Sequence, residues 1–491
     1  MTKILQTVNS IVWGAPTLVL ILGVGIYLTL RTGFAQITLL PQSAKLLFRS
    51  LSKKDSDNGS VSGFQALCTA LAATVGTGNL AGVAGAIAIG GPGAVFWMWI
   101  CGIIGMITKF AEATLSVHFR VKNAQGEFVG GPMYIIRSAL GKRWHWLAWV
   151  YSFFGVVAAF GVGNATQINA VVGGINEAVI AFGGRETFMG NLLMGVALAV
   201  LITVLLLGGM KRVGAAAERL VPAAAAGYLL LGLFVLIARF DRIPAALYSI
   251  VTGAFSPKAV TGGVVGSMFA ALRIGVSRGV FTNEAGMGTA GIAHAAAQVE
   301  HPAQQGLMGI MEVFLDTIVI CTVTALVILV SGVQIPYGQD VGVALTAQAF
   351  AAVCGDWSSV LIALALCCFA VATVLGWGLY GARCAQYLLG EHVWKKFAAV
   401  QAIAVILGAV LKTDTVWLLS ETVNGLMALP NLAALATLCP EVIRLTKEYK
   451  QLTAERSADG GTHESFDQCK PLRTVAYAEI PSPGCAGPKG R

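Results

Sequence analysis

Charged residues are scarce in this 491-residue chain, where Asp, Glu, Lys and Arg together make up 12%, against roughly 25% in soluble domains. Hydrophobic residues make up 56%. So few charges cannot cover a water-exposed surface of this size. The composition therefore excludes an ordinary soluble enzyme and indicates a polytopic membrane protein.

Sequence motifs of several enzyme and pump classes are absent. The chain has no GxxxxGK[ST] phosphate-binding loop, which argues against an ATP-driven pump, and no HExxH motif, which argues against a zinc hydrolase. Its ten cysteines form no CxxC pair, and those within apolar runs, such as Cys68 and Cys101, are expected to be small core residues. We therefore expect no enzymatic activity and no cofactor.

What the chain does contain is a series of apolar runs of about 20 residues, the length that crosses a bilayer as a helix. We expect an all-α polytopic membrane protein with about eleven transmembrane helices. The first run lacks a small-residue cleavage site and is predicted to remain as a helix. The predicted spans are 11–31, 63–90, 93–118, 146–172, 190–209, 216–238, 262–297, 306–332, 358–382, 396–411 and 416–438.

Basic residues are spread over the loops between these runs instead of forming one stripe, which argues against nucleic acid as a partner. The positive-inside rule makes the loops after spans one, three and five cytoplasmic. This places the N-terminus outside and the C-terminus in the cytoplasm, with the chain in the cell membrane. The loop residues that carry this prediction are Arg31, Lys45, Arg49, Lys53, Lys54, Arg120, Lys122, Arg137, Lys142, Arg143, Lys211 and Arg212.

Two spans, 63–90 and 262–297, would be roughly 40 to 55 Å long as straight helices, longer than a ~30 Å hydrocarbon core. Both also carry glycine and polar residues at mid-depth. Without the first span, the remaining ten form two groups of five, each opened by a broken helix, which is the inverted repeat of many secondary transporters. The predicted parts are a peripheral N-terminal helix and loop (1–62), the first repeat (63–260), the second repeat (261–440) and a mostly disordered tail (441–491).

The stretch TVGTGNLAG from Thr74 is the first of these interruptions. We expect the helix to unwind at Val75–Asn79, which would expose N–H groups for an anion and carbonyl groups for a hard cation. The alternative is that Gly78, Ala81 and Gly82 form a small-residue face for close helix packing.

Charged residues within the seventh and eighth spans are candidates for function, because such charges are costly in a membrane. We expect Arg278 and Glu284 to pair with each other and the seventh span to break at Gly275–Gly279. Glu312 and Asp316 are spaced i, i+4 and so lie on one helix face. They are either a cation or proton site or polar contacts to the neighbouring broken helix.

Two further spans carry a polar and an aromatic residue each. Phe160 and Gln167 lie in the fourth span, and Thr373 and Trp377, at i, i+4, lie in the ninth. These side chains either line a small pocket or belong to the core, and spacing alone does not decide between the two.

Three long motifs closely resemble the signatures of the alanine or glycine:cation symporter family, also called sodium:alanine symporters. They are ATVGTGNLAGVAGAI from Ala73, GGPGAVFWMWICGIIG from Gly90 and SRGVFTNEAGMGTAGIAHAAA from Ser277. The likeness extends over about residues 5 to 445. It implies a LeuT-type fold of five plus five helices with one extra N-terminal helix. It also implies that the protein imports alanine or glycine by sodium symport.

The resemblance also implies roles for matching residues. Backbone N–H groups near Thr77, Gly78 and Asn79 would bind the substrate carboxylate, and Trp377 would exclude large side chains. Sodium would be held by Ala72, Val75 and Thr373, and the rest of the substrate by Phe160, Gln167, Thr373 and Trp377, with Gly275 and Ser277 at the second break.

The chain departs from the family pattern at several positions. It has Ile274 where tryptophan is frequent, Thr282 and Thr289 where serine is common, and Gly291 where proline is usual. No arginine follows the first interruption near Gly82, so the extracellular gate of other LeuT-type transporters cannot be transferred here.

Two further functions remain alternatives. One is proton-coupled symport, with Glu312 or Asp316 as the titrating group. The other is a passive channel, against which the two broken helices argue because a channel needs no coupled ion site.

Overall fold

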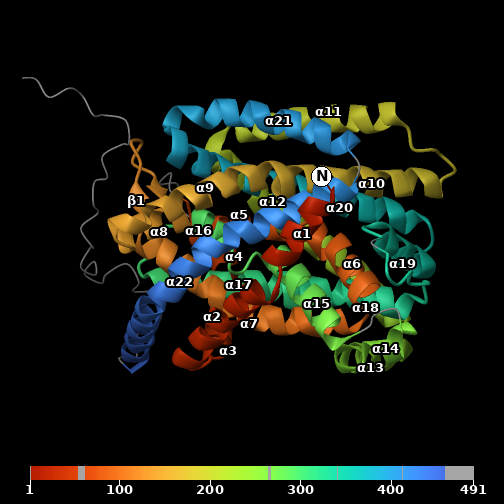
Figure 1. The fold of residues 1–491 in the computed structure, drawn as a ribbon, viewed down its shortest axis with the longest axis horizontal. Helices are drawn as coiled ribbons and strands as arrows, with labels where there is room; N and C mark the ends of the chain where they lie inside the picture. Colours follow the sequence, from red (N-terminus) through yellow and green to blue (C-terminus); the bar gives the residue numbers. More distant parts are fainter. Residues whose placement is uncertain (1, 53–60, 264–266, 340, 412, 459–491) are drawn as a thin grey trace, which may run out of the picture.

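The computed structural model describes residues 2–52, 61–263, 267–339, 341–411 and 413–458, and these are almost entirely helical (Figure 1). Within them, nine helices are long and apolar enough to cross a membrane, or ten if a bent pair is one span. The remaining predicted span corresponds to a pair of shorter helices, α15 and α16. The all-α membrane fold is confirmed, whereas the exact number of spans stays a prediction.

The colours of Figure 1 run in sequence order, from the N-terminal helices in red into the first predicted repeat. The helices that precede the repeat are α1 (Thr2–Val12), α2 (Ala15–Arg31), α3 (Ala35–Thr38) and α4 (Leu40–Ser52). The repeat contains α5 (Gly63–Thr74), η1 (Thr77–Asn79), α6 (Ala81–Gly90), α7 (Gly93–His118), β1 (Val121–Lys122), β2 (Phe128–Val129), α8 (Pro132–Ala139), η2 (Lys142–Trp144), α9 (His145–Phe160), η3 (Gly161–Ala165), α10 (Thr166–Ala181), α11 (Phe188–Leu206), α12 (Gly209–Ala238), η4 (Phe240–Arg242), α13 (Ile243–Phe255) and α14 (Pro257–Thr261).

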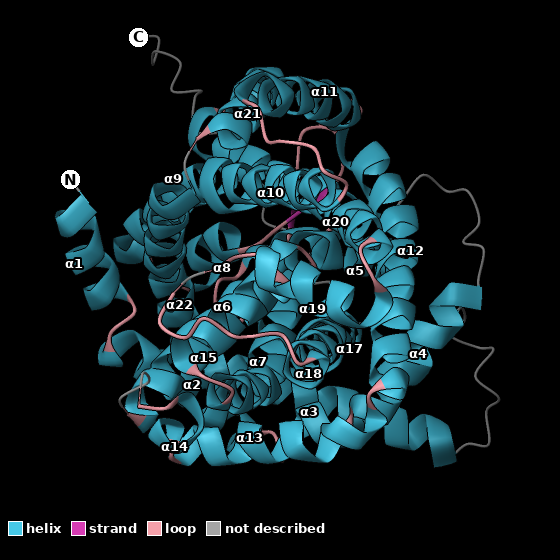
Figure 2. Ribbon diagram, turned by 90° about the vertical axis from the view of Figure 1, so that its right-hand side faces the viewer, coloured by secondary structure: helices cyan, strands magenta, loops and turns pink. Residues whose placement is uncertain are grey.

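The second predicted repeat begins with the shorter helix pair. It contains α15 (Met268–Asn283), α16 (Thr289–His294), α17 (Pro302–Val313), η5 (Phe314–Cys321), α18 (Thr322–Ser331), α19 (Ala344–Cys354), α20 (Trp357–Leu389), η6 (Glu391–Val393), α21 (Trp394–Val410) and α22 (Thr413–Ala458). Figure 2 shows α11 and α21 together at one edge of the bundle and α13 and α14 at the opposite edge. Helix α7 packs against both α15 and α17.

The first broken helix lies where the sequence predicts it. Helix α5 ends at Thr74, and the helix axis bends by 56° before the chain continues through η1 into α6. Val75 and Gly76 have extended backbones, with ψ of 95° and φ of −147° respectively. The helical ladder is therefore interrupted at mid-span.

The second break does not lie at Gly275–Gly279, so this prediction is wrong. Helix α15 is continuous to Asn283, and the chain leaves the helical conformation at Glu284, Gly286 and Gly288, all with positive φ. Gly275 instead permits close packing, since a Cβ atom there would lie 2.4 Å from the carbonyl oxygen of Ala94 in α7. The glycine is explained by helix contact and not by unwinding.

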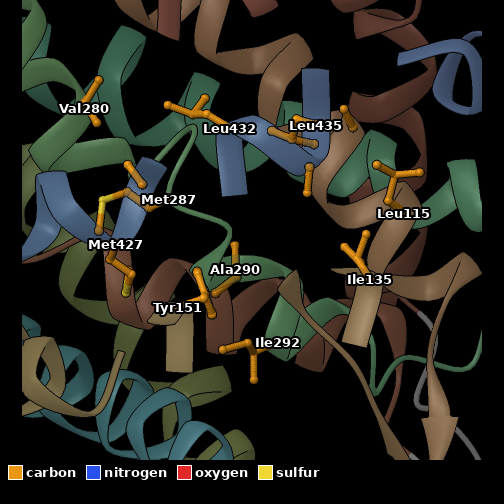
Figure 3. Packing of buried hydrophobic residues seen from close by; sticks show 14 of the residues in the cluster. Leu115, Ile135, Tyr151, Val280, Met287, Ala290, Ile292, Met427, Leu432 and Leu435 are labelled. Carbon is orange, nitrogen blue, oxygen red and sulfur yellow. The ribbon is translucent and has the colours of Figure 1, made fainter. Parts of the chain in front are cut away.

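Buried apolar side chains fix the segment around this second break. Met287, Ala290 and Ile292 belong to one buried cluster with Tyr151 of α9 and Leu432 of α22 (Figure 3). Met287 is fully buried although it lies between two helices. The irregular backbone is thus enclosed by protein, as it must be at membrane depth.

The first part of the predicted tail, 441–458, is helical. Helix α22 continues through Pro440 to Ala458, and Val442 and Leu445 are buried in the core beyond that proline. A helix in a bundle accommodates proline because its neighbours hold it in place. The remaining tail, 459–491, lies outside the described residues.

Candidate functional site

The first interruption is held by two side chains. The Asn79 Oδ1 atom accepts a hydrogen bond from the Gly76 N–H at 2.9 Å, and Gln167 Oε1 accepts from the Thr77 N–H at 3.2 Å and from the Thr77 hydroxyl at 2.9 Å. Thr77 and Asn79 are fully buried. Gln167, predicted from the fourth span, therefore meets the unwound segment directly.

Thr373 of α20 approaches the same segment from another side. Its hydroxyl lies 3.5 Å from the Val75 carbonyl oxygen and donates to the Phe369 carbonyl at 2.9 Å. A Cβ atom on Gly76 would lie 2.6 Å from the Thr373 hydroxyl oxygen, so glycine permits this approach. The structure thus brings together Val75 and Thr373, while Ala72 lies buried in the last turns of α5.

Asp316 connects the two broken helices. Its Oδ1 atom accepts a 2.7 Å hydrogen bond from Asn79 Nδ2, and its Oδ2 atom accepts a 2.8 Å bond from the Thr317 hydroxyl. The Thr317 oxygen in turn accepts from Asn283 at the end of α15. Asp316 is fully buried, and these donors are neutral. Such a carboxyl group is suited to hold a cation or a proton.

Glu312 belongs to a different network, although it is only four residues before Asp316. Its Oε1 atom lies 3.2 Å from Lys109 Nζ, and its Oε2 atom lies 3.1 Å from His294 Nε2. The π-helical segment η5 begins at Phe314, between the two acids. Because a π-helix has more residues per turn than an α-helix, the two side chains do not share the face that i, i+4 spacing predicts.

The predicted Arg278–Glu284 pair does not form. Arg278 pairs with Glu421 of α22 at 2.7 Å. Glu284 has a positive φ of 55° and lies past the end of α15, so its side chain points elsewhere. Its carboxylate accepts hydrogen bonds from Trp377 Nε1 at 2.7 Å and from the Thr289 hydroxyl at 2.6 Å.

The other predicted pocket residues differ in burial and in their contacts. Trp377 is buried beside Glu284, whereas the Phe160 ring is half-buried and stacks on Phe397 at 5.0 Å. Ser277 is half-buried within the continuous helix α15, next to Gly275. Gln167, Thr373 and Trp377 are therefore the predicted pocket residues that hydrogen bonds connect to the two breaks.

Sequence reasoning missed Glu112, which clamps the second break. Its Oε1 atom accepts from the N–H groups of Gly286 and Gly288, both at 2.9 Å, and from Asn431 Nδ2 at 2.7 Å. Lys109 lies three residues earlier on the same helix and is also fully buried. Charges in the middle of the third span were the signal that could have identified both residues.

A vestibule of about 880 Å³ leads from one end of the bundle toward the first break. Its lining includes Ala81, two residues after Asn79, as well as Arg278 and Glu421. At the opposite end the chain is closed by contacts, because Arg120 donates to the Ala295 carbonyl at 3.2 Å and Gln298 N–H to the Val61 carbonyl at 3.0 Å. Among the described residues, the vestibule thus lies on one side of the first break, and these hydrogen bonds lie on the other.

Two broken helices that meet inside the bundle, joined through Asn79, Asp316, Thr317 and Asn283, are typical of a LeuT-type secondary transporter. A solved structure, the crystal structure of MhsT in complex with L-phenylalanine, has a similar fold, with a TM-score of 0.55 and 14% identity, over 80% of this chain and 99% of that one. At this identity the likeness shows the fold alone.

Sequence comparison gives the family. The model of the sodium:alanine symporter family matches residues 1–463, and the chain belongs to this family. It is 42% identical to the sodium/alanine symporter AgcS of Methanococcus maripaludis, over 92% of this chain and 97% of that protein. It is 37% identical to the probable sodium/glutamine symporter GlnT of Bacillus subtilis, over 90% and 89% respectively. The predicted family is confirmed.

Proposed function

We propose that this protein imports a small neutral amino acid, alanine or glycine, together with sodium by alternating access. The observation that carries the proposal is the first interruption, where a bent helix places N–H groups and a carbonyl beside Gln167 and Thr373. An amino acid carboxylate suits the N–H groups at the start of a half-helix, where it would take the place of Gln167 Oε1 on the Thr77 N–H, and sodium suits the carbonyl end. The family and the relative AgcS support the same substrate and ion.

The roles of the individual residues follow from this placement. Thr77, Gly78 and Asn79 are proposed to bind the carboxylate, and Ala72, Val75 and Thr373 are proposed to hold sodium. Asp316 is proposed as the coupling charge, because its partners are neutral, whereas Glu312 is already paired with Lys109. The vestibule is lined by Gln6 and Glu186, which lie in segments predicted to be extracellular. This supports an outward-facing arrangement in the cell membrane.

Uptake into proteoliposomes tests the function. Labelled alanine is offered with an inward sodium gradient, with a matched potassium gradient, and with a proton gradient at equal membrane potential. We expect accumulation only with sodium. Accumulation driven by protons alone would support the proton-coupled alternative, and equilibration without accumulation would indicate a passive pathway.

Replacing Thr373 with alanine tests the proposed sodium site. Loss of a hydroxyl that binds a cation removes an interaction of about 1.5–3 kcal/mol, so the sodium concentration for half-maximal uptake should rise about 10-fold or more. Thr373→Ser keeps the hydroxyl and should stay close to the wild type. If Thr373→Ala leaves the sodium dependence unchanged and alters only the maximal rate, Thr373 is not a sodium ligand.

A further inference from the structure

Trp377 lies one helical turn away from the contacts that hold the first break. Trp377 follows Thr373 by four residues in α20, and Gly163 precedes Gln167 by four residues in the fourth span. The Trp377–Gly163 contact is therefore about one helical turn, or about 5.4 Å, from the residues that contact the first break. A Cβ atom on Gly163 would lie 2.1 Å from Trp377 Cβ. Gly163, within the π-helical segment η3, therefore lets Trp377 pack directly against the backbone of the fourth span. Trp377 thus lies about one turn along α20 from Thr373, whose hydroxyl approaches the unwound segment.

A residue of the second break, Glu284, also holds the indole in place. Its Nε1 atom donates to Glu284 Oε1 at 2.7 Å, and its ring contacts Tyr380 edge-on, with the centroids 5.9 Å apart. Trp377 is 1% exposed, so without Glu284 this N–H would lose its acceptor in a buried environment. An unsatisfied buried donor is costly, and the ring would shift to reduce that cost.

Glu284 has a geometry that demands an explanation. It is a non-glycine residue with φ of 55°, and its backbone N–H closes the last turn of α15 on the Val280 carbonyl at 2.8 Å. One carboxylate oxygen is bound by the Thr289 hydroxyl at the start of α16, and the other is bound by Trp377 of α20. A left-handed backbone and a charge inside a membrane protein are both unfavourable, and such features concentrate at functional sites.

We propose that Glu284 is a positioning residue that fixes the Trp377 indole and thereby sets the space available for the substrate side chain. This inference rests on the proposed function, because it assumes that an amino acid binds at the first break. Glu284 does not need to touch the substrate. It connects the second broken helix to the side chain that borders the first, and so selects small amino acids.

The experiment measures how well larger neutral amino acids compete with alanine. Sodium-driven uptake of labelled alanine is inhibited with unlabelled alanine, 2-aminobutyrate, valine and glutamine, for the wild type and for E284A, E284Q, W377F and the double variant E284A/W377F. E455A, on the exposed end of α22, controls for expression and reconstitution. The readout is the ratio of the inhibition constant of each larger amino acid to that of alanine.

We expect this ratio to fall about 10-fold or more in E284A and W377F, in line with the discrimination that a single hydrophobic pocket provides. The double variant should be no worse than either single variant, because both remove the same interaction. E284Q should retain the wild-type ratio, because its amide oxygen accepts from Trp377 and its amide nitrogen donates to Thr289. This rescue would not occur if the negative charge itself were required.

Two results would overturn the inference while leaving the proposed function intact. In the first, E284A and W377F transport alanine with an unchanged ratio, which makes the contact merely structural. In the second, E284Q loses alanine affinity as severely as E284A, while competition by lactate, which lacks the ammonium group, is unchanged. Glu284 would then be a direct ligand of the substrate's ammonium group. If the wild type itself does not accumulate alanine with sodium, the proposed function fails and the inference fails with it.

Discussion

Replacing Asn79 with alanine is expected to reduce sodium-driven alanine uptake about 100-fold. The two shortest of its buried hydrogen bonds are the one it accepts from the Gly76 N–H at 2.9 Å and the one it donates to the Asp316 carboxylate at 2.7 Å. A hydrogen bond to a charged group contributes about 1.5–3 kcal/mol and a neutral one about 1 kcal/mol. A loss of about 3 kcal/mol corresponds to about 100-fold in the population of the competent geometry. The measurement is the initial rate of uptake in proteoliposomes.

The isosteric variant Asn79→Asp sharpens this test. It would place a second carboxylate within hydrogen-bond distance of Asp316, and like charges this close are unfavourable, so it should be as damaging as alanine at neutral pH. Asn176→Ala is the matched control, because Asn176 is also a buried asparagine with a neutral partner, Asn191. If Asn79→Ala and Asn176→Ala reduce uptake equally, Asn79 has no special role at the break.

The sequence predicted the first break well because its cause is local. Gly76 and Gly78 tolerate unusual backbone and close contacts, and Asn79 can hydrogen-bond back to the chain three residues earlier, as it does to Gly76. Excess span length was a second, independent signal. Local chemistry and hydropathy therefore pointed to the same residues.

The second break was misplaced because glycine has two uses in membrane helices. Gly275 serves close packing of α15 on α7, and this use depends on a neighbour far away in the chain. The actual break follows Asn283, in the stretch EAGMG, where Gly286 and Gly288 have positive φ. Its stabiliser, Glu112, comes from another helix, and no spacing along the chain reveals that contact.

The partners of the buried charges were the least predictable part of the site. Arg278 and Glu284 are six residues apart, which suggested a pair, yet each is bound by a residue more than 90 positions later, Glu421 and Trp377 respectively. Likewise, Glu312 and Asp316 separate because η5 is π-helical. Such pairings are set by tertiary packing, so a sequence identifies the charges as important but does not identify their partners.

Replacing Lys109 with methionine is expected to destabilise the protein by about 3–5 kcal/mol, because it leaves Glu312 buried beside His294 without its lysine. Lys109 and Glu312 are both fully buried, and the Nζ and Oε1 atoms lie 3.2 Å apart. The free energy of unfolding is measured by denaturant titration in detergent. Lys109→Met combined with Glu312→Gln should recover most of the loss, since no unpaired charge remains and glutamine can still hydrogen-bond to His294.

The same double variant decides between the two buried acids as the coupling group. Glu312 holds α7, α16 and α17 together through Lys109 and His294, whereas Asp316 contacts the first break through Asn79. If Asp316 is the coupling charge, the recovered double variant should still accumulate alanine with a sodium gradient. If the double variant folds but no longer couples uptake to any gradient, Glu312 carries the coupling. The ion pair with Lys109 would then have to open during transport, which a purely structural pair does not require.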